Sequence, residues 1–282
     1  MFHLAGVDKR RFVEGVAADP QTYADWAGNG EWDIETSVVR NLMKAYDTDD
    51  PREMPPMAKK RDESGAARAV LERNVILGRG VKVGIGSVLG GEPQDLKFRG
   101  EETTVEIGDN TTIREYATIN RGTSHSMRTT VGENCFLMSY VHLAHDCHLG
   151  DSVIISNGTQ LAGHVIVESR AILSGLVAVH QFTKIGRFAF VGGCSRVAKD
   201  VPPFVKAVGN PIRLYGLNKV GLERNGFTPE VIRELKRAYR LFFNSELNLS
   251  QAREKAASEL HPYTEVQDFL RFFEQSDRGV AI

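Results

Sequence analysis

Residues 131–197 have the sequence VGENCFLMSYVHLAHDCHLGDSVIISNGTQLAGHVIVESRAILSGLVAVHQFTKIGRFAFVGGCSRV, in which every sixth residue is aliphatic. These twelve positions are Val131, Leu137, Leu143, Leu149, Ile155, Leu161, Val167, Leu173, Val179, Ile185, Val191 and Val197. A smaller residue stands four positions after each of them as far as Val191, in a series that runs from Cys135 to Ser195. Because aliphatic residues make up roughly 30% of an average chain, twelve in succession arise by chance with a probability on the order of one in a million. The six-residue period is therefore a structural repeat.

The repeat predicts a solenoid of triangular coils. Glycine follows the aliphatic residue at Val131-Gly132, Leu149-Gly150 and Ile185-Gly186, which indicates that three repeats make a coil of 18 residues. Three short strands then form the sides of a triangle, with aliphatic side chains inside and small residues where the backbone turns. Successive coils pair through parallel ladders about 4.8 Å apart. We therefore expect a parallel β-helix.

The solenoid is expected to extend upstream of residue 131 and to carry two loops. Its phase recurs at Leu71, Leu77, Val83, Leu89, Ile107, Ile113 and Ile119, which places the β-helix at residues 69–204. The steps from Gly84 to Gly108 and from Gly108 to Gly132 are each 24 residues long instead of 18, so each holds an insertion of about six residues. These insertions predict excursion loops at about residues 91–104 and 121–130, and such loops often carry binding chemistry.

The two flanking regions do not carry the repeat. After DVPPF at 200–204 the apolar spacing becomes helical, and a helix is expected from Thr228-Pro229, where threonine caps the helix and proline takes its first position. A further helix is expected after Thr264, so residues 205–282 are predicted to form an α-helical domain. Residues 1–68 form a non-repeating segment, partly helical at 34–46, to which we assign no role.

The composition argues against several classes of protein. The chain has 282 residues with 35 basic and 36 acidic side chains, and this formal charge of −1 disfavours a nucleic-acid partner. Its three cysteines, Cys135, Cys147 and Cys194, form no CxxC pair and indicate a reducing compartment. No apolar run approaches the roughly 18 residues that a membrane span needs. We expect a cytoplasmic protein with no transmembrane segment and no nucleic-acid partner.

Five of the eight histidines lie in the regular coils of the solenoid: His142, His145, His148, His164 and His180. Residues 18 apart stack on one another in such coils, which places His145 beside Gly163 and Gln181, and Asp146 beside His164. His180 is expected on the same edge of the prism. A histidine steadied by a carboxylate suits a general base, because imidazole is largely unprotonated at neutral pH.

A metal site is one alternative use of these histidines. Trimeric left-handed β-helix carbonic anhydrases hold zinc through three histidines, but their HxxxxH ligand pair is absent here. His142, His145 and His148 are spaced by three, and residues at that spacing in an extended chain do not point to one side. We therefore expect neither a metal nor an organic cofactor. The other interpretation is that the histidines are exposed turn residues without a task.

Residues outside this edge are candidates for substrate binding. Asp95 and Lys97 are either ordinary loop charges or lean over the histidines, where Lys97 would hold a phosphate and Asp95 a sugar hydroxyl. Basic residues outnumber acidic ones between 211 and 240, which indicates either a solvated face or a docking surface for an acidic partner. The glycines of GGCS at 192–195 either leave space for an acyl chain or serve as turn residues.

The chain closely resembles the acyl-carrier-protein-dependent UDP-N-acetylglucosamine O-acyltransferases of lipid A assembly. The segments that carry the resemblance, in family order, are PQDLKFRGEET, IGDNTTIREYATINRGT, HLAHDCHLG, LAGHV, VHQF, VGGCS, DVPPF and GLNKVGLERNGF. The resemblance covers about residues 74–280 and implies a left-handed parallel β-helix with a C-terminal α-helical domain, assembled as a homotrimer with active sites between neighbouring prisms. The implied reaction, the first step of lipid A biosynthesis, moves an (R)-3-hydroxyacyl group from acyl carrier protein to the glucosamine 3-OH of UDP-N-acetylglucosamine.

The same resemblance implies a role for each site residue. His145 would be the general base, Asp146 would orient it, and the N–H of Gly163 would stabilise the oxyanion. The residues that would bind sugar, nucleotide and acyl chain are His142, His164, His180, Gln181, Asp95 and Lys97. Gly193 would occupy the position that limits the acyl chain, where glycine accompanies a long chain. Asn218 would contact the acyl donor or the nucleotide, and Arg224 would bind the carrier protein.

The sequence departs from the family pattern at three places. Val220 stands where some members have glutamate, Asn225 stands where many have a second arginine, and residues 1–68 replace the coils with which members usually begin. Two other functions fit the motifs: acyl transfer to a different nucleotide sugar, including one with a 3-amino group, or an inactive trimeric scaffold that only binds acyl carrier protein. The intact His145-Asp146 pair argues against the scaffold.

Overall fold

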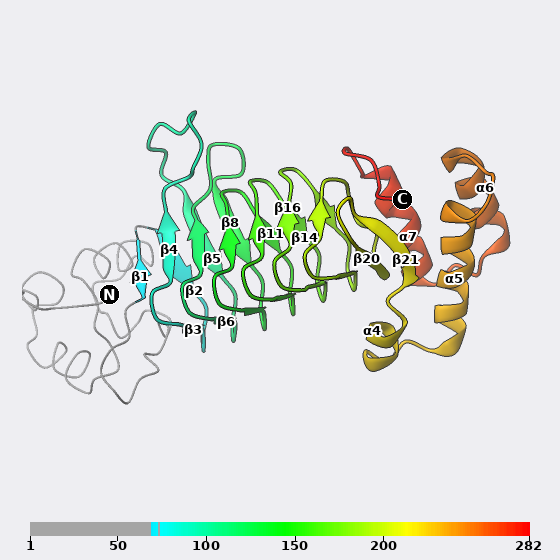
Figure 1. Ribbon diagram of the computed structural model, residues 1–282, viewed down its shortest axis with the longest axis horizontal. Coiled ribbons are helices and arrows are strands. Elements are labelled where there is room, and N and C mark those ends of the chain that lie inside the picture. Colours follow the sequence, from blue (N-terminus) through cyan, green and yellow to red (C-terminus); the bar gives the residue numbers. More distant parts are fainter. Residues whose placement is uncertain (1–68, 73) are drawn as a thin grey trace, which may run out of the picture.

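The computed structural model describes residues 69–72 and 74–282, in which the chain winds into a long prism and ends in helices (Figure 1). The expected left-handed parallel β-helix with a C-terminal α-helical region is confirmed. Residues 1–68, including the helix expected at 34–46, lie outside the described residues, as does residue 73.

Three sheets form the faces of the prism, and each coil contributes one short strand to each sheet. Sheet A consists of β1 Val70–Leu71, β4 Val88–Gly91, β7 Thr118–Asn120, β10 His142–Leu143, β13 Gln160–Leu161, β16 Ala178–Val179 and β19 Arg196–Val197. Sheet B consists of β2 Val75–Leu77, β5 Thr104–Ile107, β8 Arg128–Val131, β11 His148–Leu149, β14 Ile166–Val167 and β17 Lys184–Ile185. Sheet C begins with β3 Lys82–Val83, β6 Thr112–Ile113, β9 Phe136–Leu137, β12 Ile154–Ile155, β15 Ile172–Leu173 and β18 Phe190–Val191.

The pairing register fixes the size of the two excursion loops. Coils between residues 130 and 197 follow one another at 18 residues, as in the pairing of His142 with Gln160. Thr104 pairs with Arg128, a step of 24 that leaves the expected six extra residues in the second loop. Val75 pairs with Val105, a step of 30 that leaves twelve in the first.

The expected length of the first insertion was therefore wrong, and the cause is a misassigned glycine. Gly84 is not stacked on Gly108, because its N–H donates to the carbonyl of Ile113. Gly78 takes that place, with its N–H 2.7 Å from the oxygen of Ile107. Both glycines fit the hexad phase, so spacing alone could not distinguish them.

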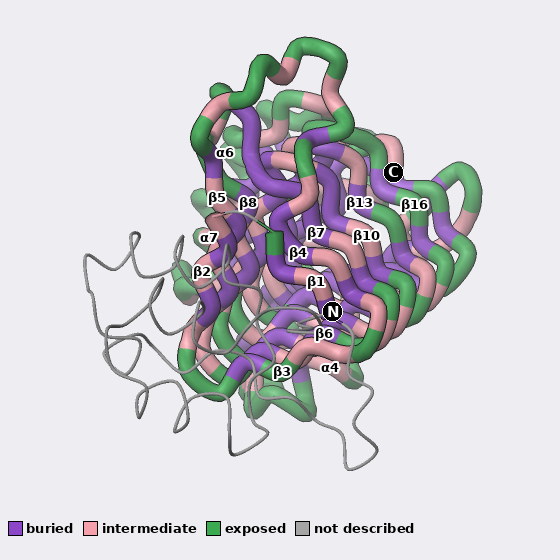
Figure 2. Tube along the Cα trace, turned by 90° about the vertical axis from the view of Figure 1, so that its left-hand side faces the viewer, coloured by how far each residue is buried: buried purple, intermediate pink, exposed green. Residues whose placement is uncertain are grey.

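The interior is filled by two residues from each repeat. The aliphatic residue ends each two-residue strand and is fully buried, as at Leu143 and Leu161. The smaller residue is also buried, as at Cys147 and Val165, and it follows the turn instead of forming it. Figure 2 shows these buried positions as continuous bands along the prism. The core is thus a stack of thin layers that has no room for larger residues at the second position.

The corner residues adopt the left-handed backbone conformation although most are not glycine. From residue 134 onward they are Asn134, Tyr140, Asp146, Ser152, Gly158, His164, Arg170, Leu176, Phe182, Phe188 and Cys194. A non-glycine residue in this conformation costs about 1–3 kcal/mol. The ladder offsets that cost, because each corner N–H donates to the preceding coil, as from His164 to the oxygen of His145 at 3.0 Å. Every corner residue other than glycine therefore holds its side chain at a fixed place.

The last coil runs into an antiparallel hairpin and four helices. The hairpin strands β20 Val205–Val208 and β21 Arg213–Leu217 extend sheet C. The helices are α4 Lys219–Arg224, α5 Pro229–Phe243, α6 Leu249–Glu259 and α7 Thr264–Glu274. The expected cap and proline of α5 are confirmed, since the N–H of Val231 donates to the Thr228 hydroxyl at 3.4 Å.

The helical region is packed on itself and joined to the prism. Phe242 of α5 contacts Phe269 and Phe273 of α7, with ring centroids 5.6 and 4.4 Å apart. Arg187 in the solenoid pairs with Asp268 of α7 at 2.6 Å. Among the helices described, none combines the length and apolar character that a membrane crossing requires.

Candidate active site

We call the edge of the prism that carries His145, Asp146 and His164 the histidine edge. It is the corner between sheets A and B. His145 and Asp146 form the turn between β10 and β11, and Gly163 and His164 form the same turn one coil later. Asp146 and His164 are the left-handed residues of their turns, with φ of 58° and 62°. The coil register therefore sets the two turns directly against each other.

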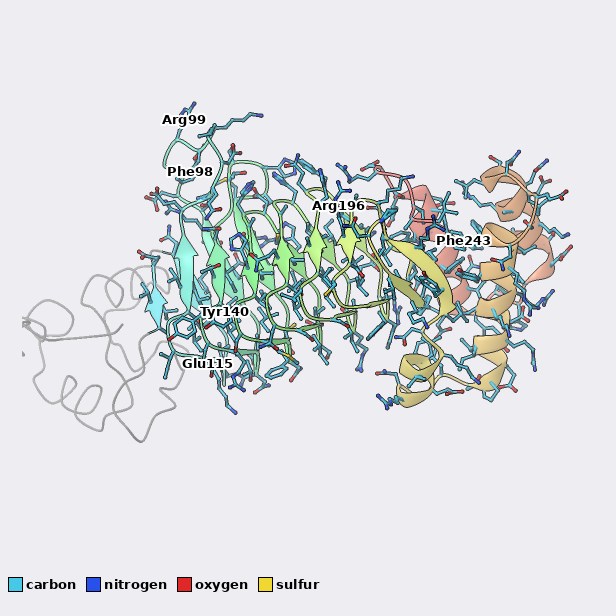
Figure 3. The ribbon with its side chains drawn as sticks, in the orientation of Figure 1. Phe98, Arg99, Glu115, Tyr140, Arg196 and Phe243 are labelled. Atoms are coloured by element: carbon cyan, nitrogen blue, oxygen red, sulfur yellow. The ribbon has the colours of Figure 1, made fainter. Side chains whose placement is uncertain are left out.

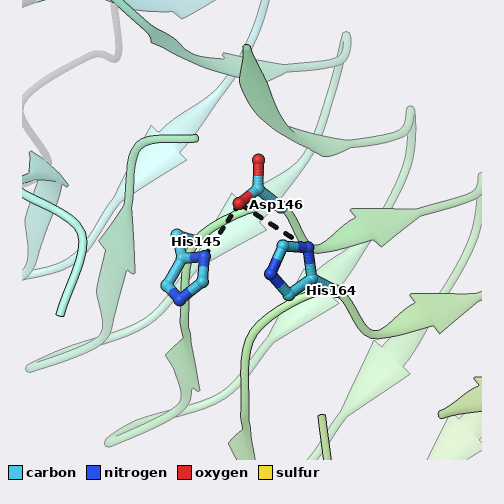
Figure 4. A group of neighbouring side chains, drawn as sticks. All are labelled: His145, Asp146 and His164. Atoms are coloured by element: carbon cyan, nitrogen blue, oxygen red, sulfur yellow. Dashed lines mark hydrogen bonds and ion pairs between the residues drawn. The ribbon is translucent and has the colours of Figure 1, made fainter. Parts of the chain in front are cut away.

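His145 and Asp146 form a hydrogen-bonded pair. Nδ1 of His145 lies 2.8 Å from Oδ2 of Asp146, and the two side chains are 12% and 0% exposed (Figure 4). An ionised carboxylate can only accept hydrogen bonds, so the proton of a neutral His145 is on Nδ1. Nε2 then carries the free lone pair that a general base needs.

Asp146 is held by the second excursion loop. Thr123 donates its N–H at 3.0 Å and its hydroxyl at 2.7 Å, and Ser126 donates its N–H at 3.2 Å and its hydroxyl at 2.5 Å. Burial alone would raise the pKa of Asp146, but the hydrogen bonds from Ser126, His145 and Thr123 outweigh it and hold that pKa well below its usual range. The carboxylate therefore stays ionised and accepts a hydrogen bond from the His145 ring. The hexad spacing did not reveal Thr123 and Ser126, because residues in an excursion have no place in the repeat.

Gly163 leaves the space that the His145 ring occupies. A β-carbon at residue 163 would lie 2.6 Å from Cε1 and 2.8 Å from Nε2 of His145. Glycine is required here by close approach of the ring. The N–H of Gly163 has no hydrogen-bond partner in the described part of the chain, so it is free to donate to a ligand beside Nε2.

His164 lies against two further aromatic rings. It stacks on Phe182 with centroids 4.2 Å apart and meets His125 edge to face at 4.6 Å. Burial lowers the pKa of His164, Asp146 partly opposes this, and His145 and His125 lower it further. Its Nδ1 is 3.7 Å from Oδ2 of Asp146 and makes no hydrogen bond to the residues described. His164 is therefore held neutral beside the pair.

His125 was missed by the sequence analysis. It lies in the second excursion loop, whose position relative to the coils cannot be calculated from an 18-residue stack. The signal that could have found it is a sixth histidine within a loop expected to cover the edge.

The remaining expected edge residues lie close to the pair but differ in environment. His142 precedes it on β10 and its Nδ1 is 2.7 Å from the Thr118 hydroxyl; burial first, and the charge of His145 second, lower the pKa of His142. Gln181 occupies the corner one coil beyond Gly163 and is exposed, as is His180 beside it. These side chains are available to a bound molecule.

The structure places two expected binding residues away from this edge. Gly193 lies at the corner between sheets C and A, where a β-carbon would lie 3.2 Å from the carbonyl oxygen of Gly175 and 3.9 Å from Cβ of Ser174. Arg224 is exposed in the last turn of α4. Neither meets His145 within one chain.

Asn218 has a structural task that the sequence analysis did not foresee. Its Oδ1 accepts from the N–H of Gly221 and caps α4, and its Nδ2 donates to the carbonyl of Phe188 at 3.0 Å. Asn225 ends the same helix and accepts a hydrogen bond from Arg170 of the solenoid at 3.0 Å.

Asp95 and Lys97 lie on the first excursion loop. Oδ1 of Asp95 accepts from the N–H of Lys97 at 2.9 Å, and the ammonium of Lys97 is exposed. The charge of Asp95 raises the pKa of His164, as the smallest of the influences on it.

The edge also contains the donor atoms of a possible metal site. One atom each of His145, Asp146 and His164 lie within 4.8 Å of one another. Both oxygens of Asp146 are already occupied by five hydrogen bonds, so a cation would have to displace them. His142 and His148 face Thr118 and Thr130 on different sheets and do not converge with His145. The donor set therefore suits proton transfer better than metal binding.

Comparisons with known proteins agree with this geometry. The profile of the UDP-N-acetylglucosamine O-acyltransferase family, domain 2, matches residues 200–281, and the bacterial transferase hexapeptide profile matches residues 128–163. The acyl-(acyl-carrier-protein)–UDP-N-acetylglucosamine O-acyltransferase of Gloeothece citriformis is 48% identical over 203 residues, which cover 71% of this chain and 74% of the relative. The enzyme of the same name from Synechocystis is 46% identical over 213 residues, covering 74% and 76%.

Solved structures give the same result. LpxA from Bacteroides fragilis, described as a UDP-N-acetylglucosamine acyltransferase, superposes with a TM-score of 0.76 at 42% identity over 77% of this chain and 85% of that one. LpxA from Acinetobacter baumannii superposes with a TM-score of 0.67 at 35% identity, over 77% and 98%. The likeness covers the solenoid and the helices together.

Proposed function

The chain belongs to the acyl-(acyl-carrier-protein)–UDP-N-acetylglucosamine O-acyltransferase family, and we propose how its residues carry out that reaction. The enzyme transfers an acyl group from acyl carrier protein to UDP-N-acetylglucosamine. In our proposal the group is an (R)-3-hydroxyacyl chain and the acceptor is the glucosamine 3-OH. The observation that carries the proposal is the His145–Asp146 pair, with Nε2 of His145 facing Gly163.

The reaction begins with removal of a proton. Nε2 of His145 takes the proton of the sugar 3-OH as the oxygen attacks the thioester carbonyl, and the carboxylate of Asp146 stabilises the imidazolium that forms. The tetrahedral oxyanion accepts a hydrogen bond from the N–H of Gly163. The C–S bond then breaks, the sulfur of the carrier protein receives the proton from His145, and the ester remains on the sugar.

Substrate binding is assigned to the residues around this pair. Asp95 and Lys97 would hold a sugar hydroxyl and a phosphate, and His142, His164, His180 and Gln181 would position the sugar, nucleotide and acyl chain. Gly193 would admit a long acyl chain, Asn218 would contact the donor or nucleotide, and Arg224 would receive the carrier protein. We assign chemistry to residues 69–204 and carrier docking to residues 205–282.

A homotrimer would bring the distant residues together. His145 lies at the corner between sheets A and B, and Gly193 lies at the corner between sheets C and A. The two residues are therefore at different corners of one prism. Two prisms side by side would set one corner against the other and form a cleft that holds both. Light scattering after gel filtration would give three times the 31.2 kDa chain mass if this assembly forms.

A cytoplasmic location is part of the proposal. All three cysteines are free, and burial raises the pKa of Cys135 to about 11 and that of Cys147 to about 12. Unpaired, buried thiols are typical of proteins from a reducing compartment.

The decisive experiment is acyl transfer with purified protein. A panel of (R)-3-hydroxyacyl carrier proteins is offered with UDP-N-acetylglucosamine or with its 3-amino analogue, and the products are identified by mass spectrometry. We expect ester formation on UDP-N-acetylglucosamine, and longer chains should be accepted because residue 193 is glycine. Transfer only to the amino sugar, or no transfer by folded trimer, would overturn the proposal.

A further inference from the structure

Arg121 is a buried cation at the junction of the two excursion loops. It follows β7, and its side chain is 8% exposed, whereas that of its ion-pair partner Glu92 is 75% exposed. Nη2 of Arg121 and Oε1 of Glu92 are 3.2 Å apart, and Nε of Arg121 has no hydrogen-bond partner in the described part of the chain. Burial of a guanidinium with so little pairing costs free energy. The other contacts of this stretch must therefore stabilise it.

These contacts hold the first excursion loop at its start, middle and end. The N–H of Arg121 donates to the carbonyl of Gly91 at 2.9 Å, and the guanidinium lies over the ring of Phe98, with Cζ 5.1 Å from the centroid. Asn120 donates from Nδ2 to the carbonyl of Glu92 at 2.8 Å. Gly122 donates its N–H to the carbonyl of Thr104 at 3.3 Å.

Phe98 ends the turn that presents the expected binding residues. Its N–H donates to the carbonyl of Asp95 at 3.0 Å, so residues 95–98 form one hydrogen-bonded turn. The ring of Phe98 lies on the projecting loop together with Arg99 (Figure 3). Arg121 therefore contacts the last residue of the turn that carries Asp95 and Lys97.

The same stretch of chain continues to the catalytic pair. Thr123 donates its N–H and its hydroxyl to Asp146, and one residue, Gly122, separates it from Arg121. A β-carbon at Gly122 would collide with the backbone of Arg128, so the connection is tight as well as short. Arg121 is thus tied to Asp146 on one side and to the turn at 95–98 on the other.

We propose that Arg121 is a positioning residue that fixes the turn at 95–98 relative to His145 and so sets the affinity for the nucleotide sugar. This rests on the proposed function, in which Asp95 and Lys97 bind that substrate. Arginine suits the place because its plane lies on an aromatic ring while its fork donates to a carboxylate. Lysine carries the same charge but does not do both.

The test compares Arg121→Lys and Phe98→Leu with the wild-type enzyme. We expect KM for UDP-N-acetylglucosamine, and its Kd from calorimetry, to rise about tenfold in both variants, while KM for the acyl carrier protein stays within about twofold. Amide exchange over residues 91–104 should be faster in Arg121→Lys. The matched control is Arg79→Lys, since Arg79 pairs with Asp109 at 3.0 Å on another edge, and all four quantities should be unchanged.

Two results would overturn the inference. One is an unchanged Kd for UDP-N-acetylglucosamine together with unchanged exchange in a folded Arg121→Lys protein. The other is an equal rise in KM for both substrates, which would mean a general structural role. Failure of the proposed function gives a different result, because the wild-type enzyme itself would then transfer no acyl group, while exchange over 91–104 would still report whether Arg121 holds the loop.

Discussion

The His145 ring lies where the side chain of residue 163 would otherwise be, since a β-carbon on Gly163 would approach Cε1 of His145 to 2.6 Å. The position of the proposed general base therefore depends on the absence of a side chain in the next coil. Replacing that glycine tests the base without changing the base itself.

Gly163→Ala is expected to lower kcat on the order of 100-fold, because the ring of His145 must move away from the reacting atoms. Thermal unfolding should change by only a few degrees, because the heavy atoms nearest to the added methyl group belong to the ring of His145 and not to the prism interior. In a His145→Ala background, Gly163→Ala should not lower kcat any further, because its effect acts through the His145 ring. An additive loss in the double variant would contradict this mechanism. Steady-state kinetics and a thermal melt of the three variants provide the measurement.

Asp146 should make the folding stability of the protein depend on pH in the acid range. Its pKa is held well below the usual value, so its ionised form contributes stability that is fully present above about pH 4 and is lost as pH falls through the lowered native pKa. Asp146→Asn should therefore be less stable than wild type at pH 6, and the difference should shrink toward pH 2. Urea unfolding midpoints across this range measure it. A difference that is constant with pH would show that ionisation of Asp146 does not matter.

The loop histidine should lower the pKa of His164. His125 lies 4.6 Å from the His164 ring, and its charge is one of the causes that lower that pKa after burial. His125→Ala removes both the charge and part of the cover, so the pKa of His164 should rise toward 6.5. Nuclear magnetic resonance titration of the imidazoles measures the shift. His261→Ala should leave the pKa of His164 unchanged, because His261 lies in the helical region, where its ring packs against Tyr263 at a tilt.

Asn218 is expected to stabilise the junction of α4 with the solenoid. Asn218→Ala removes the cap on Gly221 and the donor to Phe188 and should lower the unfolding free energy by about 1–2 kcal/mol. Asn218→Asp keeps the capping oxygen, so its unfolding free energy should fall by less. Chemical denaturation of both variants gives the comparison. Equal stability of Asn218→Ala and wild type would leave only a ligand-binding role for this residue.

The prism could be predicted from the sequence because each six-residue repeat forms one side of a triangular coil. Stacking arithmetic then placed His145, Gly163 and His164 together, since residues 18 apart must meet. It could not place His125, Thr123 or Ser126, because they belong to an excursion loop that does not follow the six-residue repeat. It also misplaced the first insertion, because Gly84 and Gly78 both follow an aliphatic residue and only backbone pairing distinguishes them. The hydrogen bond from Asn218 to Phe188 could not be predicted from the pattern of residue types, since it joins the start of a helix to a coil 30 residues away.

The corner geometry restricts how such a chain can change in length during evolution. Each corner advances by six residues and each coil by 18, so a deletion of six within the prism would rotate all later residues by one face. Gln181 would then leave the corner that holds His145 and His164, although no catalytic residue had been altered. Both length changes that interrupt the coils, at residues 91–104 and 121–127, instead project outward and leave the pairing of Thr118 with His142 intact. Related genes should therefore differ by whole coils or by loops, and rarely by single repeats inside the prism.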